Sequence, residues 1–324
     1  MAELRWHPLI QDWVMINSNR QNRPQMPKDW CPFCPGSGKV PEDVYEVLKY
    51  DNDFPALSQN PPQPDDVAND FFKVRPSYGK CEVILYSPGH HTTLKELSDE
   101  HMRKLVDLWA ERYADISKDE NIKYVFIFEN RGSMVGTSMP HPHGQIYGYS
   151  VIPKKLQLEL QSAQEYRKEK GNCLFCDMLK AEQDFGKRIV FENDSFTVFL
   201  PFFTEYPYGI YVFSKRHISH ITQMTDKEKT DFGITLKQIV GMFDTMFDKE
   251  FPYMMCMHNA PVNSGDVEED FHFHVEFFPP LRSANQQKFN ASSETGAWAH
   301  CNPRCPEETA AELREAYDRY KNSL

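Results

Sequence analysis

The chain has 324 residues, which is long enough for two domains or one large one. Its 47 acidic and 36 basic residues give a formal net charge of -11, which argues against a nucleic-acid-binding scaffold with a basic face. No apolar run approaches the ~20 residues that are needed to span a bilayer. Because the first residues, MAELRW, also lack the pattern of a signal peptide, we expect a cytoplasmic protein. We expect its partners to be small molecules.

Apolar periodicity and turn residues predict the elements of the first half. The first ~60 residues are rich in Pro, Asn and Asp, which favours loops. The expected strands cover residues 82–86, 123–129 and 144–152. A helix is expected to begin at Ser98, with Met102, Leu105, Trp109 and Tyr113 on its apolar face. Apolar residues from Leu156 to Tyr166 predict a second helix, which ends at Gly171 and links two halves.

The second half of the chain repeats the order of features in the first. The paired features are Cys31-x-x-Cys34 with Cys173-x-x-Cys176, Asn52-Asp53-Phe54 with Asn193-Asp194-Ser195-Phe196, His90 with His217, Asn130 with Asn259, and residues 141–145 with 272–276. Ordered agreement of this kind predicts an α+β fold of two tandem units, each with a mostly antiparallel sheet and a covering helix. We place the units at residues 1–170 and 171–324, with a final helix over 306–320.

The stretch from Ser138 to Gln145, SMPHPHGQ, holds two histidines and an amide at intervals of two residues. In an extended strand, residues i, i+2 and i+4 share a face, so His141, His143 and Gln145 would form one polar row. Burying polar groups without partners costs free energy, so such a row needs partners. We interpret His143 as a nucleophile, Gln145 as its helper and His141 as a metal ligand. Two structural histidines in a Pro-rich turn are the alternative.

Four of the eight cysteines form two Cys-x-x-Cys pairs, which in a reducing compartment indicate metal sites or redox pairs. Zinc prefers tetrahedral nitrogen and sulfur ligands, and the repeat supplies two such sets. The first set is Cys31, Cys34, His90 and His141, and the second is Cys173, Cys176, His217 and His272. His220 and His274 compete for places in the second set. The redox alternative needs a thioredoxin-like setting, which the sequence does not indicate.

These features resemble the galactose-1-phosphate uridylyltransferase branch of the histidine-triad superfamily, over most of the chain. The motifs that carry the resemblance are Arg20-x-x-Arg23-Pro24, Cys31-x-x-Cys34, Asn52-Asp53-Phe54, Phe128-Glu129-Asn130-x-Gly132, Gly136-x-Ser138-x-Pro140-His141-Pro142-His143-Gly144-Gln145, His258-x-Ala260-Pro261, Phe278-Pro279-Pro280-Leu281-Arg282-Ser283 and Lys288-Phe289. The resemblance implies two histidine-triad-like halves in an α+β arrangement and a homodimer.

The resemblance also implies roles for individual residues. His143 would take the nucleotidyl group, Gln145 would hold a phosphoryl oxygen, and Ser138 would contact the phosphate of the leaving group. The residues implied around the nucleotide and its phosphates are Arg20, Arg23, Asn52, Asp53, Asn130 and Gly136. Lys288 and Glu294 would reach the sugar phosphate, often across the dimer interface.

The chain departs from the family pattern at the residues of the second metal site. One branch uses a Glu and three His there, and Glu159, His258 and His274 match, but Glu276 stands where the last His would be. Those members lack the second Cys pair, whose presence resembles a branch with two zincs. That branch includes an adenylyl-transferring relative acting on ADP-glucose. We therefore rank zinc at the second Cys pair above iron at Glu159, His258 and His274. Residues 290–294 also depart from the pattern, which leaves the hexose open.

The expected activity is that of a UDP-glucose:hexose-1-phosphate uridylyltransferase of galactose metabolism, which works through a uridylyl-histidine intermediate. A neutral imidazole can attack phosphorus if one ring nitrogen is free and the other is held in place. The alternatives are an ADP-sugar or dinucleoside-polyphosphate phosphorylase with the same chemistry, and a zinc-stapled binding protein without activity. Since the carboxylate of Glu276 would repel a phosphate, we expect only the first copy to be active.

Overall fold

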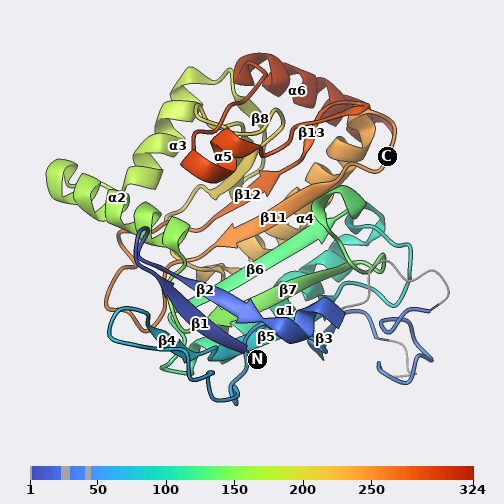
Figure 1. Ribbon diagram of the computed structural model, residues 1–324. Helices are drawn as coiled ribbons and strands as arrows, with labels where there is room; N and C mark the ends of the chain where they lie inside the picture. The colour runs from blue at the N-terminus through green and yellow to red at the C-terminus, as the bar shows by residue number, and fades with distance from the viewer. Residues whose placement is uncertain (1, 23–29, 41–44) are drawn as a thin grey trace.

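The computed structural model describes residues 2–22, 30–40 and 45–324 (Figure 1). The first half contains β1 (Ala2–His7), β2 (Asp12–Asn17), η1 (Ser18–Asn22), β3 (Leu48–Asp51), β4 (Val74–Pro76), β5 (Gly79–Leu85), η2 (Leu94–Glu96), α1 (Asp99–Ser117), β6 (Tyr124–Arg131), η3 (Ser133–Val135) and β7 (His143–Tyr149). The elements that follow are α2 (Lys154–Lys170), α3 (Leu174–Phe185), β8 (Ile189–Glu192), β9 (Phe196–Phe199), β10 (Tyr211–Ser214), η4 (Ile221–Gln223), α4 (Asp226–Met246), β11 (Tyr253–His258), β12 (His274–Phe278), β13 (Leu281–Ser283), β14 (Gln286–Gln287), α5 (Ser292–Ala297) and α6 (Pro306–Asn322).

Within the described residues, one antiparallel sheet of nine strands runs through both halves in the order β3-β5-β7-β6-β11-β12-β10-β9-β8. The halves meet at β6 and β11, where Phe128 lies opposite Cys256. The strand order on the two sides of this seam is mirrored, so β7 corresponds to β12 and β5 to β10. This arrangement confirms the predicted α+β fold of two tandem units. The division at residues 170 and 171 stays a prediction, because the sheet is continuous across the halves.

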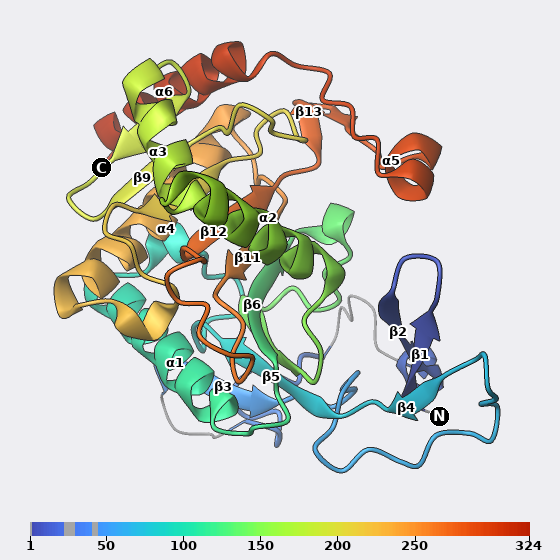
Figure 2. The same ribbon diagram turned by 90° about the vertical axis from the view of Figure 1, so that its left-hand side faces the viewer.

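Different helices cover the two faces of this sheet. Side chains that include Ile146 pack with those of α1, α4 and α6 on one face. α2 and α3 pack on the other face, against Phe199 and Phe213 of the second half (Figures 1 and 2). Successive side chains of a strand alternate between faces. His143 and Gln145 therefore lie on the face that α2 and α3 cover in the second half.

The two long helices begin at residues whose side chains cap them. Ser98 Oγ accepts a hydrogen bond from the backbone N–H of His101 at 3.1 Å, and α1 begins at the next residue. Thr225 Oγ1 accepts from the N–H of Glu228 at 3.3 Å at the start of α4. Such caps satisfy backbone donors that have no partner within the helix. The start of α1 agrees with the sequence-based expectation.

The structure differs from the expected elements mainly near the N-terminus. β1 and β2 pair as a hairpin and join β4 in a separate three-stranded sheet, where mostly loops were expected. α3, which begins between Cys173 and Cys176, was also not predicted. Among the described residues, no helix is long and apolar enough to cross a membrane.

Candidate active site and metal centres

His143 is the first residue of β7, and its ring is fixed by its own backbone neighbour. Nδ1 donates a hydrogen bond to the carbonyl oxygen of His141 at 2.7 Å. A neutral imidazole with its proton on Nδ1 carries its lone pair on Nε2. Gly144 leaves room for the Tyr86 side chain, since a Cβ there would lie 2.2 Å from Tyr86 Oη. The backbone thus presents one imidazole in one tautomer.

Gln145 lies two residues along the same face of β7, and its amide is oriented by a tyrosine. Tyr147 Oη donates to Gln145 Oε1 at 3.1 Å, and Arg20 Nη1 donates to Tyr147 Oη at 3.3 Å. With Oε1 engaged in this way, the amide presents its NH2 group as a hydrogen-bond donor. Sequence reasoning missed Tyr147, although period-2 spacing from His143 and Gln145 would have found it.

A pocket of about 140 Å³ reaches both His143 and Gln145. Its lining residues are Trp30, Pro32, Phe33, Lys39, Tyr50, Asn52, Asp53, Phe54, Val83, Ser138, Met139, His143 and Gln145. Aromatic walls of this kind suit a planar ring, and polar groups at one end suit a phosphate. Asp53 accepts from Lys39 Nζ at 2.8 Å and from Tyr50 Oη at 2.9 Å. The predicted residues Asn52, Asp53 and Ser138 are therefore brought together with His143.

A second cavity of about 250 Å³ also borders His143, and Asn130 contributes to its lining. Glu129 also lines it, with a side chain that is only 6% exposed. Tyr253 Oη donates to Glu129 Oε1 at 3.0 Å, while Glu129 Oε2 has no hydrogen-bond partner among the described residues. Burial raises the pKa of Glu129 from 4.5 to about 7.

Glu129 therefore makes stability depend on pH in a direction that can be tested. Its pKa is higher in the folded chain, so the folded chain binds the proton more tightly, and stability falls as pH rises from 4.5 towards 7. A pKa change from 4.5 to about 7 corresponds to roughly 3 kcal/mol. We expect Glu129→Gln to lack this loss in denaturant titrations between about pH 5 and 8. Parallel pH profiles of the wild type and the variant would contradict the expectation.

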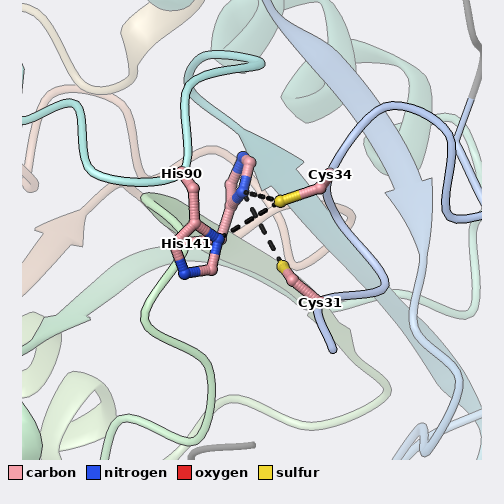
Figure 3. A group of neighbouring side chains, drawn as sticks. All are labelled: Cys31, Cys34, His90 and His141. Atoms are coloured by element: carbon pink, nitrogen blue, oxygen red, sulfur yellow. Dashed lines mark hydrogen bonds between the residues drawn. The ribbon is translucent and has the colours of Figure 1, made fainter. Parts of the chain in front are cut away.

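The first Cys/His set converges on one point (Figure 3). His141 Nδ1 lies 3.8 Å from Cys31 Sγ and 3.6 Å from Cys34 Sγ, and His90 Nδ1 lies 3.2 Å from Cys34 Sγ. His141 lies outside β7 and so does not share the row of His143 and Gln145 as the strand pattern predicted. Its Nε2 donates to the carbonyl oxygen of Ser87 at 2.7 Å, which leaves Nδ1 for a metal ion.

The second Cys/His set has the same form in the second half. Cys176 Sγ lies 3.4 Å from Nδ1 of both His217 and His272, and the four donor atoms, with that of Cys173, lie within 4.8 Å of one another. The competitor His220 contacts Thr222 Oγ1 at 2.6 Å instead. Each set could hold one metal ion. A third group comprises Glu159, His258, His274 and Glu276.

The remaining predicted residues lie elsewhere. Arg23 lies outside the described residues, and Gly136 forms a left-handed turn with φ of 75° at the end of η3. Lys288 and Glu294 are 3.7 Å apart and belong to the segment around α5, which extends away from β5 and β6 (Figure 2). Neither residue lines the pocket at His143.

A histidine held in one tautomer, an oriented amide beside it and a pocket with aromatic walls form the kind of site expected in an enzyme that transfers a group. Two family models match the chain, "Galactose-1-phosphate uridyl transferase, N-terminal domain" over residues 2–153 and its C-terminal counterpart over residues 159–321. The chain belongs to the galactose-1-phosphate uridylyltransferase family, which is a family of nucleotidyltransferases.

Individual relatives agree with this assignment. The galactose-1-phosphate uridylyltransferase of Thermotoga maritima is 40% identical over 316 residues, which are 97% of this chain and 98% of the relative. That of Saccharomyces cerevisiae is 34% identical, with coverages of 88% and 86%. A solved uridylyltransferase structure has a TM-score of 0.90 at 31% identity and covers 98% of this chain and 99% of its own. The ADP-glucose phosphorylase of Arabidopsis thaliana shares the fold, with a TM-score of 0.74 at 24% identity over 97% of this chain and 98% of its own.

Proposed function

We propose that this protein exchanges a uridylyl group between UDP-glucose and a hexose 1-phosphate, with His143 as the covalent carrier. Family membership supports the activity. The observation that carries the assignment to His143 is its Nδ1–H bond to the carbonyl oxygen of His141. That bond directs the lone pair to Nε2, as nucleophilic attack on phosphorus requires.

The exchange then proceeds in two similar steps. His143 Nε2 attacks the α-phosphorus of UDP-glucose, a nitrogen–phosphorus bond forms, and the bond to glucose 1-phosphate breaks. A second hexose 1-phosphate attacks the same phosphorus in the reverse sense and regenerates the imidazole. Catalysis of phosphoryl transfer is mainly a matter of positioning and charge stabilisation. The NH2 group of Gln145 donates to a phosphoryl oxygen, and Ser138 Oγ, which is buried and without a partner among the described residues, faces the leaving phosphate.

Tyr147 acts in this scheme by orienting the amide of Gln145. Tyr147→Phe removes the hydrogen bond to Gln145 Oε1, so the amide is free to flip and present an acceptor to the phosphoryl oxygen. We expect kcat to fall about tenfold, the value of one such hydrogen bond, with little change in thermal stability. Steady-state kinetics with UDP-glucose and galactose 1-phosphate measure this. An unchanged kcat would show that the tyrosine does not orient the amide.

We propose that both Cys/His sets bind zinc as a structural ion. Zinc bonds of ~2.3 Å to sulfur and ~2.0 Å to nitrogen, at tetrahedral angles, put the donor atoms roughly 3.3–3.8 Å apart. The sulfur–nitrogen distances in the two sets run from 3.2 to 3.8 Å. His272 and His217 resemble His141, because their Nε2 atoms contact Ser214 Oγ and the carbonyl oxygen of Glu268 at 2.8 and 2.9 Å. Such partners fix the ring that ligates the metal.

We also propose a cytoplasmic homodimer in which Lys288 and Glu294 act on the partner's pocket. The projection of α5 away from the body of the chain supports this reading (Figure 2). The Lys288 ammonium lies 4.9 Å from the centre of the Tyr206 ring, and this contact holds the lysine near the segment around α5. Analytical ultracentrifugation gives the oligomeric state, and Lys288→Ala should raise KM for the hexose 1-phosphate.

A panel of donors and acceptors tests the proposed activity. UDP-glucose and ADP-glucose are each incubated with galactose 1-phosphate or inorganic phosphate, and the products are read by mass spectrometry. We expect UDP-galactose and glucose 1-phosphate from the first donor and acceptor. Formation of ADP from ADP-glucose and phosphate, without sugar exchange, would replace the proposal with the phosphorylase alternative.

A further inference from the structure

The third group of metal-type ligands differs from the two Cys/His sets in its charge. It contains two carboxylates, Glu159 and Glu276, and two histidines, His258 and His274, whose donor atoms lie within 4.8 Å of one another. It has no thiolate. The ammonium of Lys155 contacts the Glu276 carboxylate directly and lies 3.8 Å from Glu159 Oε1. A cation is therefore already present in the group.

The group lies where α2 crosses β11 and β12 (Figure 2). Lys155 and Glu159 are one helical turn apart on α2, while His258 ends β11 and Glu276 is on β12. His258 and Glu276 are only 2% and 1% exposed, so the charge of the Glu276 carboxylate must be compensated within the group. The Lys155 side chain is half exposed, and its ammonium lies against the carboxylate of Glu276.

Hydrogen bonds fix both imidazoles. His274 Nδ1 donates to the carbonyl oxygen of His272 at 2.9 Å, and His258 Nδ1 donates to Glu159 Oε2 at 2.9 Å. Their Nε2 atoms lie 3.3 Å (His258) and 3.8 Å (His274) from the oxygens of Glu276. Burial raises the pKa of Glu276, but the charges of His258 and Lys155 outweigh it and hold the pKa well below its usual range. The carboxylate is thus ionised and contacts the ammonium of Lys155.

We propose that the ammonium of Lys155 is the cation of this group and that the group holds no metal ion in the folded protein. The same oxygen of Glu276 contacts both Lys155 Nζ and His258 Nε2. A divalent ion bound between Glu276 and His258 would therefore meet the ammonium at close range. Repulsion between like charges is weakly screened in a buried site, so the ion and the ammonium compete for one place.

The imidazole at the corresponding place in the second half is enclosed by aromatic rings. His274 repeats the arrangement of His143, since its Nδ1 donates to the carbonyl oxygen two residues before it. However, His274 is 1% exposed and packs against the rings of Phe175 and Tyr211, with centroid distances of 5.3 and 5.9 Å. Lys155 of α2 pairs with Glu276, which lies two residues along β12 from this imidazole. The first half has a pocket at the corresponding place on the same face of the sheet.

Metal uptake by the purified holoprotein tests the proposal. Wild type, Lys155→Met and the control Lys154→Met, which changes a neighbouring lysine outside the group, are incubated anaerobically with Fe²⁺ or Mn²⁺ and desalted. Metals are then counted by inductively coupled plasma mass spectrometry. Carboxylate and imidazole ligands suit these ions, whereas thiolates retain zinc, so the added metal reports this group. We expect no uptake by wild type or Lys154→Met, and about one added ion per chain of Lys155→Met.

Thermal melting gives a second readout that does not depend on metal uptake. Lys155→Met leaves Glu276 without its cation, so we expect Tm to fall by about 5 °C. The double variant Lys155→Met with Glu276→Gln removes the unpaired charge as well, so we expect it to recover most of that loss. Stoichiometric iron or manganese in the wild type that Glu159→Gln removes would overturn the proposal. So would a Lys155→Met variant that binds no added ion and melts like the wild type, or a double variant no more stable than the single one. Zinc content and sugar exchange are measured on the same samples, so that failure of the zinc or exchange proposal can be told apart from failure of this one.

Discussion

Replacing His143 with alanine is expected to reduce exchange between UDP-glucose and galactose 1-phosphate by on the order of 10⁴-fold or more. The reason is that the imidazole forms the covalent bond that divides the exchange into two steps. The other side-chain amine in the pocket, that of Lys39, is paired with Asp53. Initial rates measured by coupled assay or mass spectrometry give the fold-change.

The fold of this variant should survive, because His143 lines a pocket and its removal opens little new space in the core. Zinc content and Tm measured on the same preparation serve as the control. A His143→Ala enzyme with intact zinc that keeps more than about a hundredth of the wild-type rate would exclude His143 as the essential nucleophile.

Replacing Cys31 with alanine is expected to remove one bound zinc ion and to destabilise the whole chain. Metal binding is coupled to folding, and the first set joins the loop of Cys31 and Cys34 to the segments of His90 and His141. We expect the free energy of unfolding to fall by more than about 4 kcal/mol and Tm by on the order of 10 °C. Sugar exchange should fall as well, because the carbonyl oxygen of His141 positions His143.

The matched control for this change is Cys301→Ala. Cys301 is exposed and belongs to none of the metal-type groups among the described residues. Its replacement should change stability by no more than about 0.5 kcal/mol. If Cys31→Ala kept its full zinc content and the wild-type Tm, the proposed role of the first set would be wrong.

The parts of the molecule that the sequence predicted are those with short, repeated spacings. The order of His90 with His217 and of residues 141–145 with 272–276 predicted two tandem units, and the structure has mirrored strand orders on either side of β6 and β11. The same order predicted which residues would gather in the two Cys/His sets. Spacing carries this information because duplicated units keep the positions of residues that must meet in space.

The parts that the sequence could not predict depend on tertiary contacts. Period-2 reasoning assigned His141 to the strand of His143, but the proline at 142 and the pull of His141 towards Cys31 and Cys34 start β7 only at His143. Likewise, nothing in the spacing of α2 indicated that Lys155 would lie on Glu276, because that contact joins residues 121 positions apart. Periodicity describes neighbours within an element, not pairings between elements.

The most direct test of the central claim is the intact mass of the protein after incubation with UDP-glucose alone. With no hexose 1-phosphate to accept the group, the first step stops at the carrier. We predict a mass increase of one uridylyl group per chain, mapped by peptide sequencing to His143 and lost in acid, together with release of glucose 1-phosphate. An enzyme that exchanges sugars at full rate without any such adduct, or with the adduct on another residue such as His274, would contradict the account.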